Sequence, residues 1–254
     1  MLAAALPASP IRDERSRRLR RTGVSDGGER GPGRLDGPAP ACGPGCACAL
    51  GNEFGERQAR RDLATYRRSG PDRTTRWLIE GLTGDGVAGL SVLDIGAGVG
   101  AVHLELLQAG ASTAVDVDGS PAYVGAAREE ATRQGVVERV SYDVGDFVER
   151  APSIEPVDLV ALDRVVCCYP DMRELVRLSV ARARHRYGLV YPRDAWWIRA
   201  GSGAFNAVAR VTRRRIRTWV HRTADVDAIV RDAGFVPRLE RSGLFWQVVV
   251  YERA

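Results

Sequence analysis

The chain lacks lysine altogether, so its 37 basic residues are all arginine. It also lacks any apolar run of about 18 residues, the length that a membrane-spanning helix needs. Residues 1–50 hold eight Arg and five acidic residues, and the remaining 29 Arg face 27 acidic residues. A body this close to neutral offers no basic face of the kind that binds nucleic acid. We therefore expect neither a nucleic-acid partner nor a membrane partner.

Cysteine is scarce, with only five residues in the chain. Three of them, Cys42, Cys46 and Cys48, lie near the N-terminus, and Cys167 and Cys168 are adjacent. An odd count that includes an adjacent pair is not a disulfide framework. The C-x3-C-x-C run has no fourth ligand, so we expect no metal. The first residues lack the pattern of a secretory signal, and we expect a cytoplasmic protein with reduced thiols.

The chain divides by composition into three parts. Residues 1–50 are rich in Gly, Pro, Ala and Arg and poor in large apolar residues, which predicts a disordered tail. Apolar residues at helical spacing predict two helices, 53–68 and 74–82, which we interpret as an N-terminal helical cap over residues 51–85. Residues 86–254 form the expected main domain, with a substrate-side insertion at about 193–222.

From residue 90 onward, short apolar runs alternate with helical stretches. The expected strands are 90–95, 112–117, 140–144, 157–162, 187–191, 236–239 and 245–251, and the expected helices are 102–108, 121–134, 172–184 and 226–232. This alternation predicts an α/β fold with a doubly wound, mostly parallel seven-stranded sheet. The last two strands are joined by Ser242-Gly243, which predicts a C-terminal antiparallel hairpin.

The most informative run is Val92-Leu93-Asp94-Ile95-Gly96-Ala97-Gly98-Val99-Gly100. Its glycines permit positive φ and let the backbone approach a ligand, and the first strand-to-helix turn of an open α/β sheet lies at the ligand crevice. Gly96, Gly98 and Ala101 also satisfy the dinucleotide pattern, so a nicotinamide-dependent oxidoreductase on a Rossmann fold is one alternative. Asp94 argues against it, because a carboxylate repels a pyrophosphate and tolerates a cationic sulfonium. A non-catalytic cofactor-binding protein is a second alternative.

The same run resembles motif I of class I methyltransferases, which use S-adenosyl-L-methionine. The span 51–253 is similar to a bacterial group related to magnesium-protoporphyrin O-methyltransferases, through Tyr66-Arg67-Arg68-Ser69-Gly70-Pro71 and Cys168-Tyr169-Pro170. That group typically has His where this chain has Cys168. This departure argues against porphyrin as the substrate and leaves methyl transfer unaffected. The resemblance implies a Rossmann-like methyltransferase fold with S-adenosyl-L-methionine as the cofactor.

Most of the expected cofactor site follows from this resemblance. It implies that Asp94 holds the loop and the methionine end of the cofactor. It also implies that Asp146 contacts the adenine amino group and that Phe147 covers the adenine ring. The second strand adds Asp118, because an acid at this strand end can accept both ribose hydroxyls, with Asp116 as the reserve. The residues expected to bind the cofactor are Tyr66, Asp94, Gly96, Gly98, Gly100, Asp118, Asp146, Phe147 and Asp163.

The acceptor side is less defined. The fourth strand lacks the Asn/Asp-Pro-Pro-Tyr/Phe motif of many enzymes that methylate DNA bases or amide nitrogens, which favours O- or S-methylation of a small molecule. The expected catalytic residues are Asp163, Tyr169 and His221, of which Asp163 or His221 would assist deprotonation of a phenol or thiol. Aromatic and Arg side chains after the fifth strand suit a flat, anionic acceptor. The expected substrate residues are Tyr191, Arg193, Trp196 and Trp197.

Overall fold

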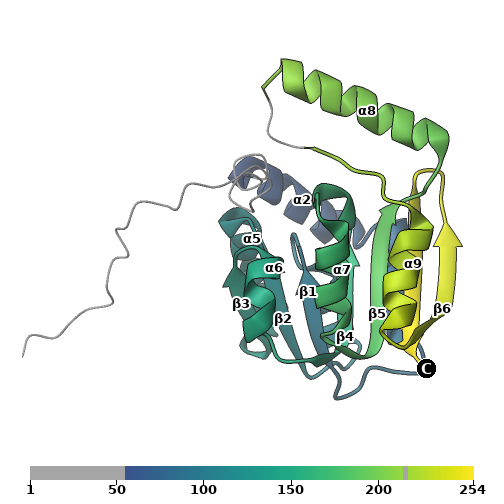
Figure 1. Cartoon of the computed structure of the whole chain (residues 1–254). Helices are drawn as coiled ribbons and strands as arrows, with labels where there is room; N and C mark the ends of the chain where they lie inside the picture. The colour runs from purple at the N-terminus through teal and green to yellow at the C-terminus, as the bar shows by residue number, and fades with distance from the viewer. Residues whose placement is uncertain (1–54, 214–216) are drawn as a thin grey trace, which may run out of the picture. The chain divides into compact units, whose positions relative to one another are not determined.

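Figure 1 shows the computed structural model, which describes residues 55–213 and 217–254. The expected tail, its three cysteines and the first residues of the expected cap lie outside these described residues. None of the helices in the described ranges is both long and apolar enough to cross a membrane.

A seven-stranded sheet with the order β3-β2-β1-β4-β5-β7-β6 forms the centre of the fold. Every strand pair from β3 to β5 is parallel, and β7 is antiparallel to both β5 and β6. This confirms the doubly wound, mostly parallel sheet and its C-terminal antiparallel hairpin. The strands are β1 Ser91–Ile95, β2 Thr113–Asp118, β3 Val140–Val144, β4 Val157–Asp163, β5 Ala183–Pro192, β6 Phe235–Ser242 and β7 Trp246–Arg253.

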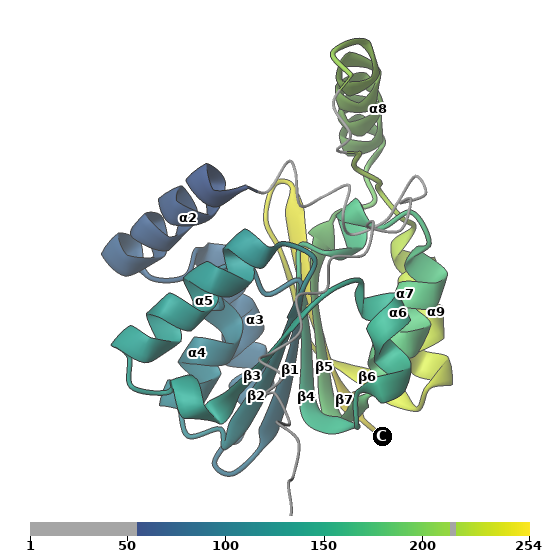
Figure 2. The same cartoon turned by 90° about the vertical axis from the view of Figure 1, so that its left-hand side faces the viewer.

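Helices cover both faces of the sheet, as Figure 2 shows. One face packs against the elements α3, α4 and α5, with α2 beside α5, and the other against α6, α7 and α9. The helices are α2 Glu56–Ser69, α3 Arg73–Thr83, α4 Ala101–Gln108, α5 Pro121–Arg133, α6 Phe147–Arg150, α7 Met172–Val180, α8 Trp196–Val211 and α9 Thr223–Asp232, with short 3-10 turns η1 Val137–Arg139, η2 Ala151–Ser153 and η3 Val166–Cys168. Two apolar clusters, one on each face of the sheet, form the core.

Helix α5 begins where the sequence predicts, and its start fixes the turn after β2. The Ser120 hydroxyl accepts a hydrogen bond from the Tyr123 backbone N–H, and Pro121 occupies the first helical turn. Ser is a favoured N-cap and Pro fits this position because its missing N–H would have no intrahelical partner. The cap and the proline therefore fix the conformation of the turn that follows Asp118, the last residue of β2.

The boundary between α7 and β5 differs from the prediction. The helix expected over 172–184 ends at Val180, and β5 begins at Ala183 instead of Tyr187. The backbone N–H of Val157 donates to the carbonyl of Arg182, and the segment after it pairs with β4. Main-chain pairing at the sheet thus outweighs the helix propensity of this Ala- and Arg-rich segment.

Helix α8 and the chain that follows it stand at the end of the sheet where β5 stops (Figure 1). The side chains of Ser202 and Asn206 both donate to the carbonyl of Thr218, and the Thr218 N–H donates back to Asn206. These bonds tie one face of α8 to its own return segment.

Candidate functional site

A cavity of about 460 Å³ opens at the carboxyl ends of the parallel strands. Its wall combines the loops after β1, β2, β3 and β4 with residues of α2 and the start of α3. Open α/β sheets bind ligands at this edge, and cavities of this size hold small molecules. Of the cofactor residues predicted from the sequence, seven line the cavity: Tyr66, Gly96, Gly98, Asp118, Asp146, Phe147 and Asp163.

The glycine loop requires glycine for two reasons. Gly96, Gly98 and Gly100 all have positive φ, at 62°, 59° and 81°, which side chains rarely tolerate. A β-carbon on Gly96 would also approach Val165 to 2.5 Å. The loop therefore keeps its backbone exposed at the cavity, and Gly100 forms the N-cap of α4 just behind the wall.

Asp94 is placed behind the loop instead of on the cavity wall. It is fully buried, and its carboxylate accepts hydrogen bonds from the backbone N–H of His103 at 3.2 Å and from Nδ1 of the same residue at 2.9 Å. A carboxylate at the first turn of α4 is favourable because the helix dipole is positive there. Asp94 is thus bonded to His103 of α4, and neither Asp94 nor Gly100 reaches the cavity surface.

Two acids on β2 have opposite surroundings. Asp118 lines the cavity and accepts the backbone N–H groups of Gly98 at 2.9 Å and Ser120 at 2.8 Å. Asp116 is fully buried, and neither of its oxygens has a hydrogen-bond partner within the described residues. Burial raises the pKa of Asp118 to about 6 despite these bonds, and burial beside Asp94 raises the pKa of Asp116 well above its ordinary value. The strand-end acid is therefore the one available to a ligand.

The loop after β3 presents an acid and an aromatic ring together. Asp146 caps α6 by accepting from the Val148 N–H at 2.9 Å, and it accepts from the Tyr169 hydroxyl at 3.0 Å. Burial and the neighbouring Asp146 raise the pKa of Tyr169. The Tyr169 phenol therefore stays protonated and donates a hydrogen bond to Asp146. This suits a role in positioning Asp146 better than a role as a base.

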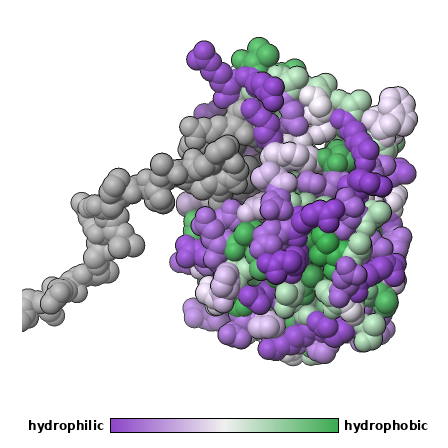
Figure 3. All heavy atoms as spheres, in the orientation of Figure 1, coloured by the Kyte–Doolittle hydropathy of each residue, from purple (hydrophilic) through white to green (hydrophobic). Residues whose placement is uncertain are grey.

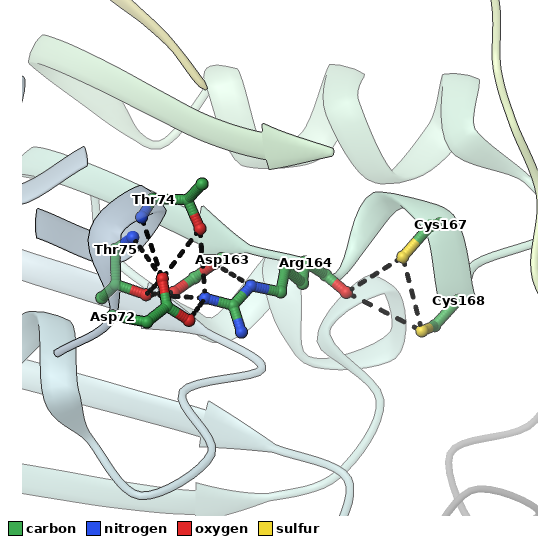
Figure 4. A network of polar contacts seen from close by, with 7 residues as sticks. All are labelled: Asp72, Thr74, Thr75, Asp163, Arg164, Cys167 and Cys168. Carbon is green, nitrogen blue, oxygen red and sulfur yellow. Dashed lines mark hydrogen bonds and ion pairs between the residues drawn. The ribbon is translucent and has the colours of Figure 1, made fainter. Parts of the chain in front are cut away.

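A polar network joins the end of β4 to the first turn of α3 (Figure 4). The Thr75 hydroxyl donates to Asp163 at 2.6 Å, and the Arg164 guanidinium contacts both Asp163 and Asp72. Arg164 adopts φ 64°, a conformation that is costly for a side chain other than Gly. Burial raises the pKa of Asp163 to about 6, although Arg164 and Thr75 oppose that shift.

The two adjacent thiols lie beside this network. Their sulfur atoms are 3.7 Å apart, and each contacts the carbonyl of Arg164. Cys167 is buried, while Cys168 lines the cavity. Nowhere in residues 55–213 and 217–254 do three or more His, Cys, Asp or Glu side chains gather in a group that could hold a metal ion.

The α2 side of the wall contains polar residues that the sequence analysis missed. The Tyr123 hydroxyl donates to Asp62 at 2.5 Å, and the Tyr66 hydroxyl donates to Glu105 at 2.9 Å. Asp62 lies one helical turn before Tyr66, which is the signal that would have placed it on the same face of α2. Asp72 was also missed, although its position before Thr74 and Thr75 is typical of an N-cap.

Besides Asp94 and Gly100, five predicted residues lie outside the cavity wall, which runs no further along the chain than Leu175 among the described residues. Tyr191 is 1% exposed within the core beneath the sheet edge, so its predicted contact with substrate is wrong in this structure. Nε2 of His221 lies 3.1 Å from the carbonyl of Val166 and 3.3 Å from that of Tyr169. His221 therefore stabilises the loop after β4 from outside the cavity. The other three are Arg193, Trp196 and Trp197.

Arg193 and the two tryptophans belong to the base of α8. Arg193 donates from its backbone to the carbonyl of Phe245 and from its side chain to the carbonyl of Gly243, so it is committed to the β6–β7 turn. Trp196 is 81% exposed and Trp197 is 39% exposed. Neither one contributes to the cavity as it stands.

The charge of the wall selects among ligands. It carries five carboxylates, those of Asp62, Asp72, Asp118, Asp146 and Asp163, against the single guanidinium of Arg164. Such a wall repels phosphates and attracts a cation. S-adenosylmethionine has a sulfonium and an ammonium group, ribose hydroxyls for Asp118, and an adenine for Asp146 and Phe147. The residues present therefore fit this cofactor better than a dinucleotide.

Residues 92–185 match the family described as "Methyltransferase domain". Ribosomal protein L11 methyltransferases from Halorhodospira halophila and Xylella fastidiosa are 42% identical over 77 residues and 50% identical over 66 residues. These matches cover 30% and 26% of this chain and 26% and 21% of the relatives. The chain thus spans about a quarter of the length of these curated relatives.

Solved structures share the fold over a longer stretch. Magnesium protoporphyrin IX methyltransferase from Synechocystis PCC 6803 with bound SAH has a TM-score of 0.65 at 20% identity, covering 82% of this chain and 99% of that chain. Geranyl diphosphate methyltransferase in complex with SAM has a TM-score of 0.59 at 16% identity, covering 81% of this chain and 94% of that chain.

The fold and the wall of the cavity define the class: this is the Rossmann-like fold of class I methyltransferases. The sequence match agrees with this fold, because residues 92–185 match the model of a methyltransferase domain.

Proposed function

We propose that the protein as a whole is an S-adenosylmethionine-dependent methyltransferase that methylates an oxygen or sulfur atom of a small molecule. One observation carries the proposal. The glycine loop and Asp118 are hydrogen-bonded to each other on the wall of a cavity whose charged side chains are nearly all carboxylates. That combination suits a ligand with ribose hydroxyls and a positive charge.

In the proposed reaction, S-adenosylmethionine supplies an electrophilic methyl group on a sulfonium. The protein's task is to align the partners and exclude water, since the electrophile already carries its charge. We assign Asp118 to the ribose, Asp146 and Phe147 to the adenine, and the loop from Gly96 to Gly98 to the central part of the cofactor. Tyr169 holds Asp146 in place through its hydroxyl.

Asp163 is the proposed proton acceptor for a phenol or thiol. It lies at the end of β4 on the cavity wall, and burial raises its pKa to about 6, closer to neutrality than that of an ordinary carboxyl group. A general base works best when its pKa lies near the operating pH. Thr75 and Arg164 fix the orientation of the carboxylate. His221 acts only through the loop that it braces.

A binding experiment followed by an activity panel tests the proposal. Titration calorimetry of the full chain with S-adenosylhomocysteine should show one site, with Asp118→Ala as the impaired control. Phenols, thiols and carboxylic acids are then incubated with S-adenosylmethionine, and S-adenosylhomocysteine release is measured. Ribosomal protein L11 joins the panel because the curated relatives are named for it.

Each outcome separates one reading from the others. Release of S-adenosylhomocysteine with a phenol or thiol supports the proposal. Methylation of the ribosomal protein alone would contradict the small-molecule acceptor and keep the cofactor. Binding of NAD in place of S-adenosylhomocysteine would favour a nicotinamide-dependent oxidoreductase. Cofactor binding without methylation of any acceptor in the panel favours a non-catalytic cofactor-binding protein.

A further inference from the structure

Helix α8 presents a long apolar face that nothing in the described structure covers. Trp196, Phe205, Val208 and Val211 are 81%, 42%, 62% and 83% exposed. At 100° per residue, these positions spread over half of the helix circumference, with Trp196 and Phe205 at its two edges. The exposed residues Trp197, Ala200, Gly201, Ala204 and Ala207 lie between those edges. The opposite side holds Ile198, Ser202, Asn206 and Ala209, which face the body and the return segment.

A second exposed apolar element lies at the same end of the molecule. The turn between β6 and β7 carries Leu244, which is 81% exposed, and Phe245, which is 38% exposed. The carbonyl of Phe245 accepts the backbone N–H of Arg193, three residues before α8 begins. Figure 3 shows green and pale residues along the crest of the molecule, where Figure 1 places α8. Two separate exposed apolar elements at one end of the molecule fit a flat binding surface better than a groove that holds a single helix.

The charge of residues 195–222 indicates the chemical nature of that flat surface. Residues 195–222 contain seven Arg and no acidic residue, whereas the rest of the chain beyond residue 50 holds 22 Arg and 27 acidic residues. Asp194, just before this segment, forms an ion pair with Arg199 at 2.5 Å. Arg199 and Arg210 lie on α8 itself, and the other five Arg follow it along the chain. Exposed aromatic and apolar residues combined with Arg are typical of segments that lie in the interface of an anionic bilayer. A second copy of α8 would offer no carboxylate to these guanidinium groups.

We propose that α8 and the β6–β7 turn dock the protein on an anionic lipid surface. The helix begins four residues after β5 ends at Pro192, so it stands at the same edge of the sheet as the cavity. Docking thus brings the cavity edge close to the bilayer. This replaces the expectation of no membrane partner, which rested on the absence of a spanning run. The proposal is independent of methyl transfer.

Vesicle sedimentation with the full chain tests the proposal. The probes are phosphatidylcholine vesicles with and without phosphatidylglycerol, at low and high salt. We expect binding to the anionic vesicles that weakens as salt is added. The triple change Phe205→Ser, Val208→Ser and Val211→Ser should weaken partitioning at least tenfold, and Arg210→Gln by roughly fivefold. Val236→Ser, on the edge strand β6, is the matched control and should bind as the wild type does.

Two further measurements make the result decisive. Circular dichroism and thermal unfolding establish that the triple variant is folded, and the single change Val208→Asp repeats the test with one substitution. The proposal is overturned if the wild type ignores anionic vesicles, or if the folded triple variant binds them equally well. A dimer in light scattering that the triple variant dissociates, without vesicle binding, would assign the face to a second copy of the chain instead.

Discussion

The two halves of the sheet present very different surfaces at the same edge. Around β1, β2 and β3, the strand-end loops place glycines and carboxylates on a cavity wall. Around β5, β7 and β6, no described residue lines that cavity, and the segment after β5 instead exposes the apolar helix α8. The first half forms a cavity lined mainly by carboxylates, which suits the positively charged cofactor that we propose. The second half exposes an apolar helix that we propose docks on an anionic lipid surface.

A second contrast lies within the first half of the sheet, between Asp118 and Asp116, two acids on one strand. Both side chains belong to β2, yet Asp118 accepts two backbone N–H groups at the cavity, whereas Asp116 is fully buried and accepts no hydrogen bond from the described residues. A ligand contact therefore depends on two residues of register. Substitutions at these and neighbouring positions therefore differ in their expected effect on binding.

The largest effect is expected for Asp118→Ala. A carboxylate that accepts two ribose hydroxyls makes charge-assisted bonds worth roughly 1.5–3 kcal/mol each, so affinity for S-adenosylhomocysteine should fall by one to several orders of magnitude. Calorimetry checks this, and thermal unfolding should show little loss of stability. Unchanged affinity in the variant would contradict the assignment of the ribose to Asp118 on β2.

Gly98→Val should weaken S-adenosylhomocysteine binding at least tenfold, or about 1.4 kcal/mol. Gly98 has φ 59° and lines the cavity, so a branched residue is strained there and its side chain competes with the ligand. Gly135→Val is the matched control, because Gly135 also has positive φ, at 72°, but does not line the cavity. If both variants lose affinity equally, backbone strain alone explains the loss.

Acid should weaken cofactor binding. Because the pKa of Asp118 is raised to about 6, its ionised form is lost as the pH falls through that value. Affinity for S-adenosylhomocysteine should drop about tenfold between pH 7 and pH 5 if the ionised form alone binds. Asp118→Asn should flatten this dependence. A variant that keeps the full pH dependence would assign the titration to Asp163.

The smallest effect on binding is expected for Asp116→Asn, with a change of less than about twofold. Its effect should appear in stability instead. Because the pKa of Asp116 is raised in the fold, its contribution is fully present below the ordinary pKa of about 4 and is lost as the pH rises. Denaturant unfolding should therefore show that the variant gains stability over the wild type at pH 8 relative to pH 5. A larger loss of cofactor affinity than in Asp118→Ala would reverse the register.

Local signals explain which parts were predictable from the sequence. The run from Val92 to Gly100 combines a strand, glycines and a helix start, and the Ser120-Pro121 pair fixes the next turn, so residues on this side of the cavity could be predicted individually. The α7–β5 boundary was wrong because pairing with β4 is a long-range interaction that helix propensity does not contain. Tyr191 was misassigned because alternation along a strand does not show which face the neighbouring helices bury.

The acceptor side was harder to predict because its geometry is non-local. Asp72 and Arg164 are 92 residues apart in sequence, yet they form an ion pair at the cavity. Exposure of α8 likewise depends on what packs against it, which its composition does not encode. The domain boundaries and the proposed acceptor remain predictions for experiment.

A crystal structure with bound S-adenosylhomocysteine tests the central claim most directly. We predict that the ribose hydroxyls lie within hydrogen-bond distance of the Asp118 carboxylate, with the adenine between Asp146 and Phe147. A ligand bound elsewhere, or a ribose that makes no contact with Asp118, would contradict the assignment of this half of the sheet to the cofactor.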